Sequence, residues 1–128
     1  MAPERKSVFV VDDDPSMRLG MERLLRVHGF RAMLFASADA LLGHGDFSEA
    51  FCIILDINLN GESGIDLRLR LRLEGGGEAG PPVIYVTGND SESNRTAAIA
   101  SGCIAYLTKP FAARSLIEPI ERLCATAA

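Results

Sequence analysis

The chain has 128 residues, of which 48% are apolar and 23% are charged, and its formal net charge is −4. This length fits one domain, long enough to bury about two-thirds of the surface of its unfolded chain. The acidic balance does not indicate a nucleic-acid surface, and no run approaches the roughly 18 apolar residues of a membrane-spanning helix. We therefore expect neither nucleic acid nor a membrane as a partner.

The cysteines and histidines are few and scattered. Cys52, Cys103 and Cys124 lie far apart without a C-x-x-C pair, which indicates reduced, buried cysteines in a cytoplasmic protein. His28 and His44 are isolated, and two histidines are too few to indicate a zinc site or a histidine-based triad. The first residues carry an apolar run of only about four residues before three acids, so we expect no signal peptide.

Short apolar runs alternate with helical segments along the chain. After a first strand at 7–12, Asp14 as N-cap and Pro15 as first helical residue begin a helix that Gly29 ends. Further strands are predicted at 31–36, 51–56, 83–87 and 104–108. Further helices are predicted at 37–42, 65–73, 91–101 and 112–125, the last with a kink at Pro119. Segment 74–82, rich in glycine and proline, is expected to be a surface loop.

One segment fits two interpretations. Residues 65–73 read IDLRLRLRL, a strict alternation that is typical of a strand. We interpret it as a helix because Leu and Arg are good helix formers and because a parallel crossover needs a helix at this point. The consequence is that Leu67 or Leu71 is expected to be partly exposed.

Five successive strand–helix units predict a parallel sheet with helices on both faces. By resemblance to known flavodoxin-like proteins, we expect a flavodoxin-like (βα)5 three-layer α/β sandwich whose five-stranded parallel sheet has the order 2-1-3-4-5. One domain is expected to occupy residues 1–128, with no output domain in this chain.

Carboxylates gather where two strands end. Asp12, Asp13 and Asp14 follow the first strand, and Asp56 ends the third. In an open parallel sheet, ligands bind outside the carboxyl ends of the strands, and in the expected order the first and third strands are neighbours. Clustered acids repel one another, and a hard divalent cation with oxygen ligands relieves that repulsion.

The fourth and fifth strands add a hydroxyl and an ammonium group to the same edge. Thr87 ends the fourth strand and Lys109 ends the fifth. Each feature alone has an ordinary explanation, such as an acidic N-cap region or a loop residue. In this order and spacing they favour a site for a phosphoryl group, whose charge a cation and a lysine neutralise while a hydroxyl donates to its oxygens.

Four motifs carry a family resemblance. VVDDDPSMR (10–18), ILDINLNGESG (54–64), VTG (86–88) and YLTKPF (106–111) resemble the receiver domains of two-component response regulators. The similarity extends from Val8 to Leu123, and the local sequence is most like that of the FixJ type. The resemblance implies that Asp56 is the phosphoacceptor. It also implies that Mg²⁺, or Mn²⁺ as an alternative, is bound by Asp56, by Asp13 directly, by Asp12 through water and by the backbone carbonyl of Asn58.

The resemblance also assigns roles around the acceptor. Thr87 and Lys109 are expected to contact the phosphoryl oxygens, and Tyr106 to rotate when Thr87 moves. Three further residues are expected to shape the site: Gly88 by leaving space, Asn89 beside the path of the attacking water, and Pro110 through a cis bond to Lys109 that aims the lysine.

The implied function is signalling. A sensor histidine kinase or a phosphotransfer protein would donate the phosphoryl group, and the domain would switch conformation and pass the signal to an effector that the sequence does not name. It would not be an enzyme beyond assisting its own phosphotransfer and autodephosphorylation. The surface of the fourth helix, fifth strand and fifth helix is the family's usual signalling face and the candidate face for a homodimer.

Two other functions use the same residue types. A Mg²⁺-dependent phosphatase with Asp56 as nucleophile needs a second Asp two residues later, where this chain has Asn58. A pseudo-receiver that only binds partners would have lost the acceptor, an acid or the lysine, and all are present. The sequence therefore favours the phosphoacceptor over both alternatives.

Overall fold

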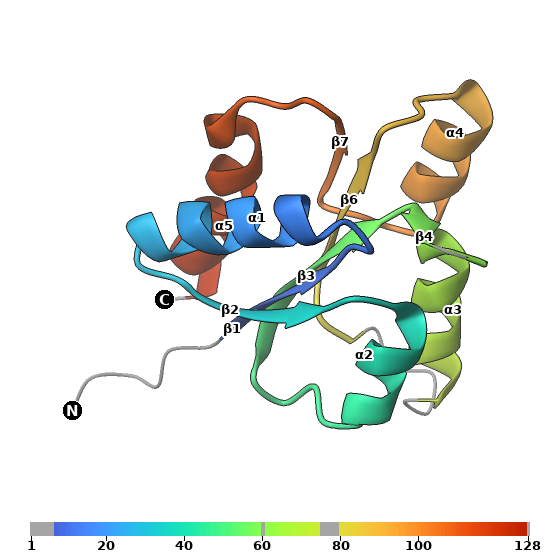
Figure 1. Cartoon of the computed structure of the whole chain (residues 1–128), viewed down its shortest axis with the longest axis horizontal. Helices are drawn as coiled ribbons and strands as arrows, with labels where there is room; N and C mark the ends of the chain where they lie inside the picture. The colour runs from blue at the N-terminus through green and yellow to red at the C-terminus, as the bar shows by residue number, and fades with distance from the viewer. Residues whose placement is uncertain (1–6, 60, 75–79, 128) are drawn as a thin grey trace.

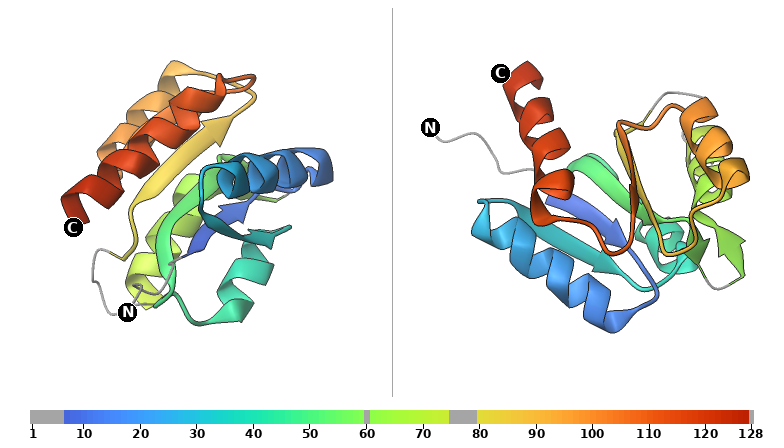
Figure 2. Two further views of the ribbon diagram at one scale, coloured as in Figure 1. Left: turned by 90° about the vertical axis from the view of Figure 1, so that its left-hand side faces the viewer. Right: turned by 90° about the horizontal axis from the view of Figure 1, so that it is seen from above.

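The computed structural model describes residues 7–59, 61–74 and 80–127. A five-stranded parallel sheet lies between two layers of helices (Figures 1 and 2). Its strands are β1 (Ser7–Val11), β2 (Arg31–Phe35), β3 (Ala50–Asp56), β6 (Val83–Thr87) and β7 (Ala105–Thr108). The helices are α1 (Pro15–Val27), α2 (Ala38–His44), α3 (Gly64–Glu74), α4 (Glu92–Ala100) and α5 (Ala113–Ala127). The spatial order β2-β1-β3-β6-β7 confirms the flavodoxin-like order expected from the sequence.

The sheet buries apolar side chains on both faces. Along β1, Val8 and Val10 face the layer of α1 and α5, while Phe9 and Val11 face the layer of α2, α3 and α4. This alternation follows from the two-residue period of a strand, and all five residues of β1 are buried. A central strand that is covered on both sides favours apolar residues on both faces, which explains the unbroken apolar run that follows Ser7.

Side-chain caps begin three of the helices. Asp14 accepts a hydrogen bond from the backbone N–H of Ser16 at 2.9 Å, with Pro15 next to it at the start of α1. Ser37 and Ser91 cap α2 and α4 in the same way, through hydroxyl groups that accept backbone N–H bonds at 3.0 Å. These contacts satisfy N–H groups that have no partner within the helix.

Segment 65–73 is helical, as predicted, and lies within α3. Leu67 is buried, Leu71 is half-buried and Leu69 is 45% exposed. An alternating pattern cannot follow the 3.6-residue period of a helix, so Arg68 is carried to the buried side. Among the described residues, its Nη1 atom has no hydrogen-bond partner.

One segment differs from the sequence prediction. The residues after β3, to which the sequence assigned no strand, form a short antiparallel pair of β4 (Asn58–Leu59) with β5 (Glu62–Ser63). Pro119, where the sequence predicts a kink, lies inside helix α5. The expected loop at 74–82 falls largely on residues 75–79, outside the described residues.

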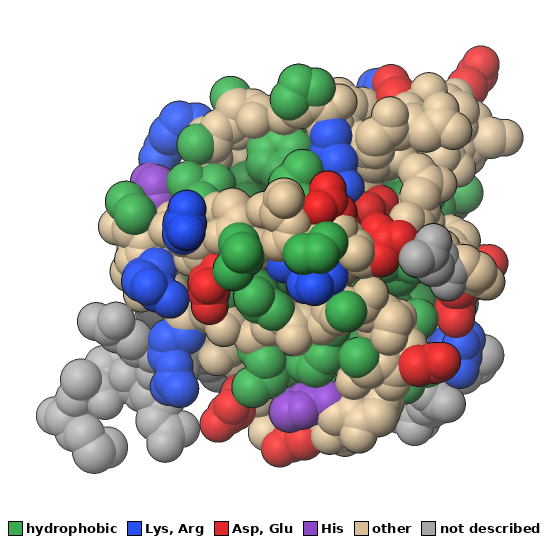
Figure 3. All heavy atoms as spheres, viewed as in Figure 1, with side chains coloured by type: hydrophobic (Ala, Val, Ile, Leu, Met, Phe, Trp, Pro, Cys, Tyr) green, Lys and Arg blue, Asp and Glu red, His purple; other side chains and the backbone are tan. Residues whose placement is uncertain are grey.

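Charged side chains of both signs are interspersed with small apolar patches on the face seen in Figure 3. None of the helices in the described part of the chain combines the length and the apolar character needed to cross a bilayer.

Gly64 stands where α3 approaches the end of β3. A Cβ atom at this position would lie 2.3 Å from the carbonyl oxygen of Asp56 and 3.3 Å from the Cα of Ile57. The N–H of Gly64 donates to the carbonyl of Ile57 at 2.9 Å, so the approach is fixed by a backbone bond. Only glycine fits this contact without displacing backbone.

We expect Gly64→Ala to lower the free energy of unfolding by about 2–3 kcal/mol, because backbone must move to admit the methyl group. Gly20→Ala is the matched control. Gly20 lies inside α1 with no atom within 4 Å of the added Cβ, so the same change should raise stability by about 0.5–1 kcal/mol. Urea unfolding measures both, and a Gly64→Ala protein as stable as the wild type would contradict the contact.

Candidate functional site

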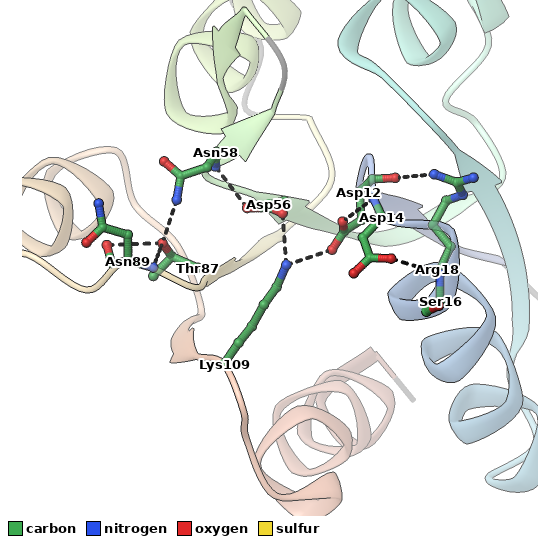
Figure 4. Close-up of polar contacts among 9 residues, drawn as sticks. All are labelled: Asp12, Asp14, Ser16, Arg18, Asp56, Asn58, Thr87, Asn89 and Lys109. Atoms are coloured by element: carbon green, nitrogen blue, oxygen red, sulfur yellow. Dashed lines mark hydrogen bonds and ion pairs between the residues drawn. The ribbon is translucent and has the colours of Figure 1, made fainter.

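The site lies at the carboxyl edge of the sheet, where three strand ends meet (Figure 4). Asp12 follows β1, Asp56 ends β3, and Lys109 follows β7. The Nζ atom of Lys109 lies 2.9 Å from Oδ2 of Asp56 and 3.0 Å from Oδ2 of Asp12. One ammonium group therefore bridges two carboxylates from different strands.

Three acids converge at this edge. Asp12, Asp13 and Asp56 each offer a carboxylate oxygen, and these oxygens all lie within 4.8 Å of one another. Asp12 and Asp56 are buried, and Asp13 is half-buried. Three carboxylates form an oxygen-only set of the kind that hard divalent cations prefer.

Burial and hydrogen bonding oppose each other at Asp56. Burial raises the pKa of Asp56 above its ordinary value, and the hydrogen bonds from Lys109 and from the backbone N–H of Asn58 offset only part of that rise. The N–H of Asn58 donates to Oδ1 at 2.8 Å, so both carboxylate oxygens of Asp56 have a donor. Burial works to lower the pKa of Lys109, but its bonds to Asp56 and Asp12 outweigh this and raise it.

The hydroxyl of Thr87 is held by two neighbouring loops. Its Oγ1 accepts from the backbone N–H of Asn89 at 3.0 Å and from Nδ2 of Asn58 at 3.1 Å, and it lies 3.2 Å from the carbonyl of Asn89. A Cβ atom at Gly88 would meet no atom within 4 Å, so the space next to Thr87 is open. The sequence did not suggest the bond from the side chain of Asn58 to Thr87, so this contact was missed.

Tyr106 and Pro110 lie on either side of Lys109 along the chain. The Lys109–Pro110 peptide bond is cis, as expected. Tyr106 is half-buried on β7, and its hydroxyl donates to Oδ1 of Asp90 at 3.0 Å, a partner that the sequence did not suggest. Sequence reasoning also gave no role to Arg18, whose Nη1 donates to the backbone carbonyl of Asp12 at 2.7 Å.

Residues 8–121 match the family model for the response regulator receiver domain. The chain belongs to this family. Among curated relatives, the sensory transduction protein RegX3 of Mycobacterium tuberculosis is 37% identical over 115 residues, covering 90% of this chain and 49% of its own. Nodulation protein W of Bradyrhizobium diazoefficiens is 32% identical over 120 residues, covering 93% of this chain and 51% of its own. The receiver thus spans about half the length of these relatives.

Solved structures agree with this assignment. A CheY-like receiver domain protein from Methanospirillum hungatei superposes with a TM-score of 0.83 at 26% identity, covering 97% of this chain and 98% of that one. The response regulator StyR superposes with a TM-score of 0.83 at 35% identity, covering 96% of this chain and 61% of its own. The chain is therefore a receiver domain of two-component response regulators, which are signalling proteins, and its acid cluster matches the Mg²⁺-binding acids of such domains in kind.

The raised pKa of Asp56 makes a prediction about stability. Because the ionised form is disfavoured in the folded receiver, Asp56→Asn should raise the free energy of unfolding at neutral pH, without divalent cations. The gain should disappear as pH falls through the raised pKa towards 3.8 and below, where Asp56 is protonated in both states. Urea unfolding in EDTA across this range is the measurement.

Asp46→Asn is the control of opposite sign. The pKa of Asp46 is lowered, chiefly by the hydrogen bond from the backbone N–H of Ser48, so its ionised form favours folding. Removing that charge should lower stability at neutral pH, and the difference should vanish as pH falls through the lowered pKa. The same sign for both variants would contradict the electrostatic assignment of Asp56.

Proposed function

We propose that this receiver accepts a phosphoryl group on Asp56 from a sensor histidine kinase or a histidine phosphotransfer protein, and changes conformation in response. The observation that supports this most directly is the setting of Asp56, buried at the end of β3 with Oδ2 2.9 Å from the ammonium of Lys109. Asp12 and Asp13 lie beside it. An acid kept in such a cluster, at the cost of burying it, is typical of a functional group.

The transfer is a substitution at phosphorus. A carboxylate oxygen of Asp56 attacks the phosphorus of a phosphohistidine, an O–P bond forms, and the P–N bond breaks with its electron pair leaving on the imidazole nitrogen. The N–H of Asn58 holds one oxygen of Asp56 in place, and the ammonium of Lys109 is positioned to follow the negative charge onto the phosphoryl oxygens. Hydrolysis by water at phosphorus then returns free Asp56 and phosphate.

The residues at this edge fit a divalent cation. Asp12, Asp13 and Asp56 would hold Mg²⁺ or Mn²⁺ together with the backbone carbonyl of Asn58, and the bound cation supplies positive charge against the phosphoryl oxygens. Among the described residues, the carboxylate of Asp13 makes no hydrogen bond or ion pair, which suits it as a direct ligand. Asp12, whose two oxygens already accept from Asp14 and Lys109, suits a contact through water.

Thr87 couples phosphorylation of Asp56 to the change in conformation. A hydroxyl that moves toward a phosphoryl group on Asp56 has to leave its present contacts with Asn58 and Asn89. The loop after β6 then loses an anchor, and Tyr106, which contacts that loop through Asp90, is free to turn. Gly88 leaves open space next to Thr87 for this motion. We propose that the side chain of Asn89 flanks the path of the attacking water.

The rival functions receive less support. A phosphatase of the aspartate-nucleophile type needs a general acid two residues after Asp56, and Asn58 has an amide that is engaged with Thr87. A pseudo-receiver has no use for three acids whose oxygens lie within 4.8 Å of one another, or for a lysine that hydrogen-bonds two of them. We therefore propose a signalling phosphoacceptor that acts catalytically only on its own phosphorylation and dephosphorylation.

Several further proposals concern the whole chain. We infer one receiver domain across residues 1–128, supported by the match at 8–121 and by one continuous sheet. A cytoplasmic location is supported by three free cysteines. The α4–β7–α5 surface is the candidate for a homodimer, and Ile99 and Ile104 on this side are 63% and 40% exposed.

Acetyl phosphate with Mg²⁺ should add the mass of one phosphoryl group to the chain, because the site itself carries the catalytic groups. Asp56→Asn should abolish the gain, while Asp39→Asn, an exposed acid in α2, should leave it intact. Intact mass spectrometry reads all three. Phosphorylation of Asp56→Asn at the wild-type level would overturn the assignment of the acceptor.

Mg²⁺ should stabilise the fold because it binds only the assembled acids. At a free concentration near 100 times its Kd, the gain should be about 2.7 kcal/mol. Asp13→Asn should remove most of that gain. Glu118→Gln, which neutralises an acid in α5, should keep it. Thermal unfolding with and without Mg²⁺ is the measurement, and an unchanged Tm in wild type at tens of millimolar Mg²⁺ would contradict the acid site.

A further inference from the structure

Three side chains from three parts of the fold meet beside β7 and contact one another in a closed triangle. The hydroxyl of Tyr106 donates to Oδ1 of Asp90 at 3.0 Å, and Nη2 of Arg95, in α4, donates to Oδ2 of the same carboxylate at 2.6 Å. The guanidinium carbon of Arg95 lies 5.3 Å from the centroid of the Tyr106 ring. Each contact uses a different atom or face, so all three form at once.

The triangle is joined to the phosphoryl-accepting edge through one backbone residue. Asn89 precedes Asp90 and is hydrogen-bonded to Oγ1 of Thr87 through its backbone N–H at 3.0 Å. The carbonyl of Asn89 also accepts from Nδ2 of Asn94 in α4 at 3.2 Å. The segment 89–90 is thus held at one end by Thr87 and at the other by Tyr106.

We propose that Asp90 and Arg95 are positioning residues that latch Tyr106 in the orientation seen here, and that the latch limits how much of the unphosphorylated receiver occupies the switched conformation. The inference rests on the proposed function, in which Tyr106 turns when Thr87 moves. Both latch residues follow Gly88 in the chain, and neither Asp90 nor Arg95 touches the acceptor.

The contacts among Asp90, Arg95 and Tyr106 are weak enough to break when the receiver switches. The side chains of Asp90 and Arg95 are 39% and 54% exposed, so water screens their attraction. An exposed ion pair together with a cation–π contact shifts a two-state population by about three- to tenfold. The pKa of Asp90 is lowered, first by the bond from Arg95 and then by that from Tyr106, in keeping with a carboxylate that both groups hold.

The two latch residues carry opposite charges, and this gives a sharp test. Asp90→Ala removes a negative charge and Arg95→Ala removes a positive one, so a purely electrostatic effect on an anionic probe has opposite signs in the two variants. A latch predicts the same sign, because either change frees Tyr106. By linkage, a probe that favours the switched state should bind both variants about three- to tenfold more tightly than wild type.

The probe is beryllium fluoride, a phosphoryl mimic, titrated with Mg²⁺ into the full chain. Arg26→Ala is the matched control, because Arg26 is also an exposed helical arginine in an ion pair, with Glu22 of α1. We expect its affinity to equal that of wild type. Opposite shifts in Asp90→Ala and Arg95→Ala, or no shift in either, would overturn the latch.

A second readout needs no phosphoryl mimic. The chain has two tyrosines, Tyr85 and Tyr106, so fluorotyrosine labelling gives two fluorine NMR resonances, which Tyr106→Phe assigns. In the unmodified protein, both latch variants should shift or broaden the Tyr106 resonance and leave that of the buried Tyr85 in place. A Tyr106 resonance unchanged in both variants would overturn the latch.

The two readouts separate the latch from the proposed function. If wild type binds no beryllium fluoride and gains no mass from acetyl phosphate, the phosphoacceptor assignment fails, and the fluorine spectra of the resting protein still decide whether Asp90 and Arg95 hold Tyr106. If the acceptor reacts normally and Tyr106 ignores both variants, the latch fails and the proposed function stands.

Discussion

The ammonium of Lys109, placed between the carboxylates of Asp12 and Asp56, is the interaction on which the carboxyl edge of the sheet depends. Both carboxylates are buried, and buried charges are tolerated only when they are paired. Lys109 directly follows β7, which is separated from β3 by β6, so its long side chain reaches across the end of β6 to make the pair. The same contact therefore ties the end of β7 to the ends of β1 and β3.

Around this ion pair, the site divides into a rigid part and an adaptable part. Asp56 is held by backbone: the N–H of Asn58 binds its carboxylate, the N–H of Ile57 donates to the carbonyl of Val86 at 2.9 Å, and Gly64 packs against its carbonyl. Thr87, in contrast, is held by contacts with the exposed residues Asn58 and Asn89. A nucleophile benefits from fixed geometry, whereas a group that has to move benefits from weak contacts.

The strands and helices could be predicted from the periodicity of the sequence, because that periodicity reflects which residues are buried. The apolar strands, the cap at Asp14, the helix starts at Ser37 and Ser91 and the parallel direction of the strands were predictable, since each depends on local chemistry or on covering two faces of a sheet. The strand order itself came from the resemblance to a known fold. Contacts between residues that are far apart in the sequence, and that do not share a helix or strand, were not predictable.

The close approach of Gly64 to Asp56, the bond from Asn58 to Thr87, and the triangle of Tyr106, Asp90 and Arg95 arise only once strands are in register. Within α3, helical period overrode alternation, and that is why Arg68 is buried and Leu69 is exposed. The distances along the chain that separate these partners carry no periodic signal, so only the assembled sheet reveals which side chains meet.

The energetics of switching follow from where the charges lie. In the proposed function, phosphorylation would add negative charge at Asp56. That charge would strengthen the contact of Lys109 and would attract the hydroxyl of Thr87 away from its present partners. The contacts of Asp90 and Arg95 that oppose this motion are individually weak, because both side chains are exposed. A large population shift needs a free-energy difference of several kcal/mol, about 5.5 kcal/mol from 1:99 to 99:1, and no single surface contact supplies it. The strong term therefore has to come from the buried edge, while surface residues such as Asp90 and Arg95 set the starting balance on which that term acts.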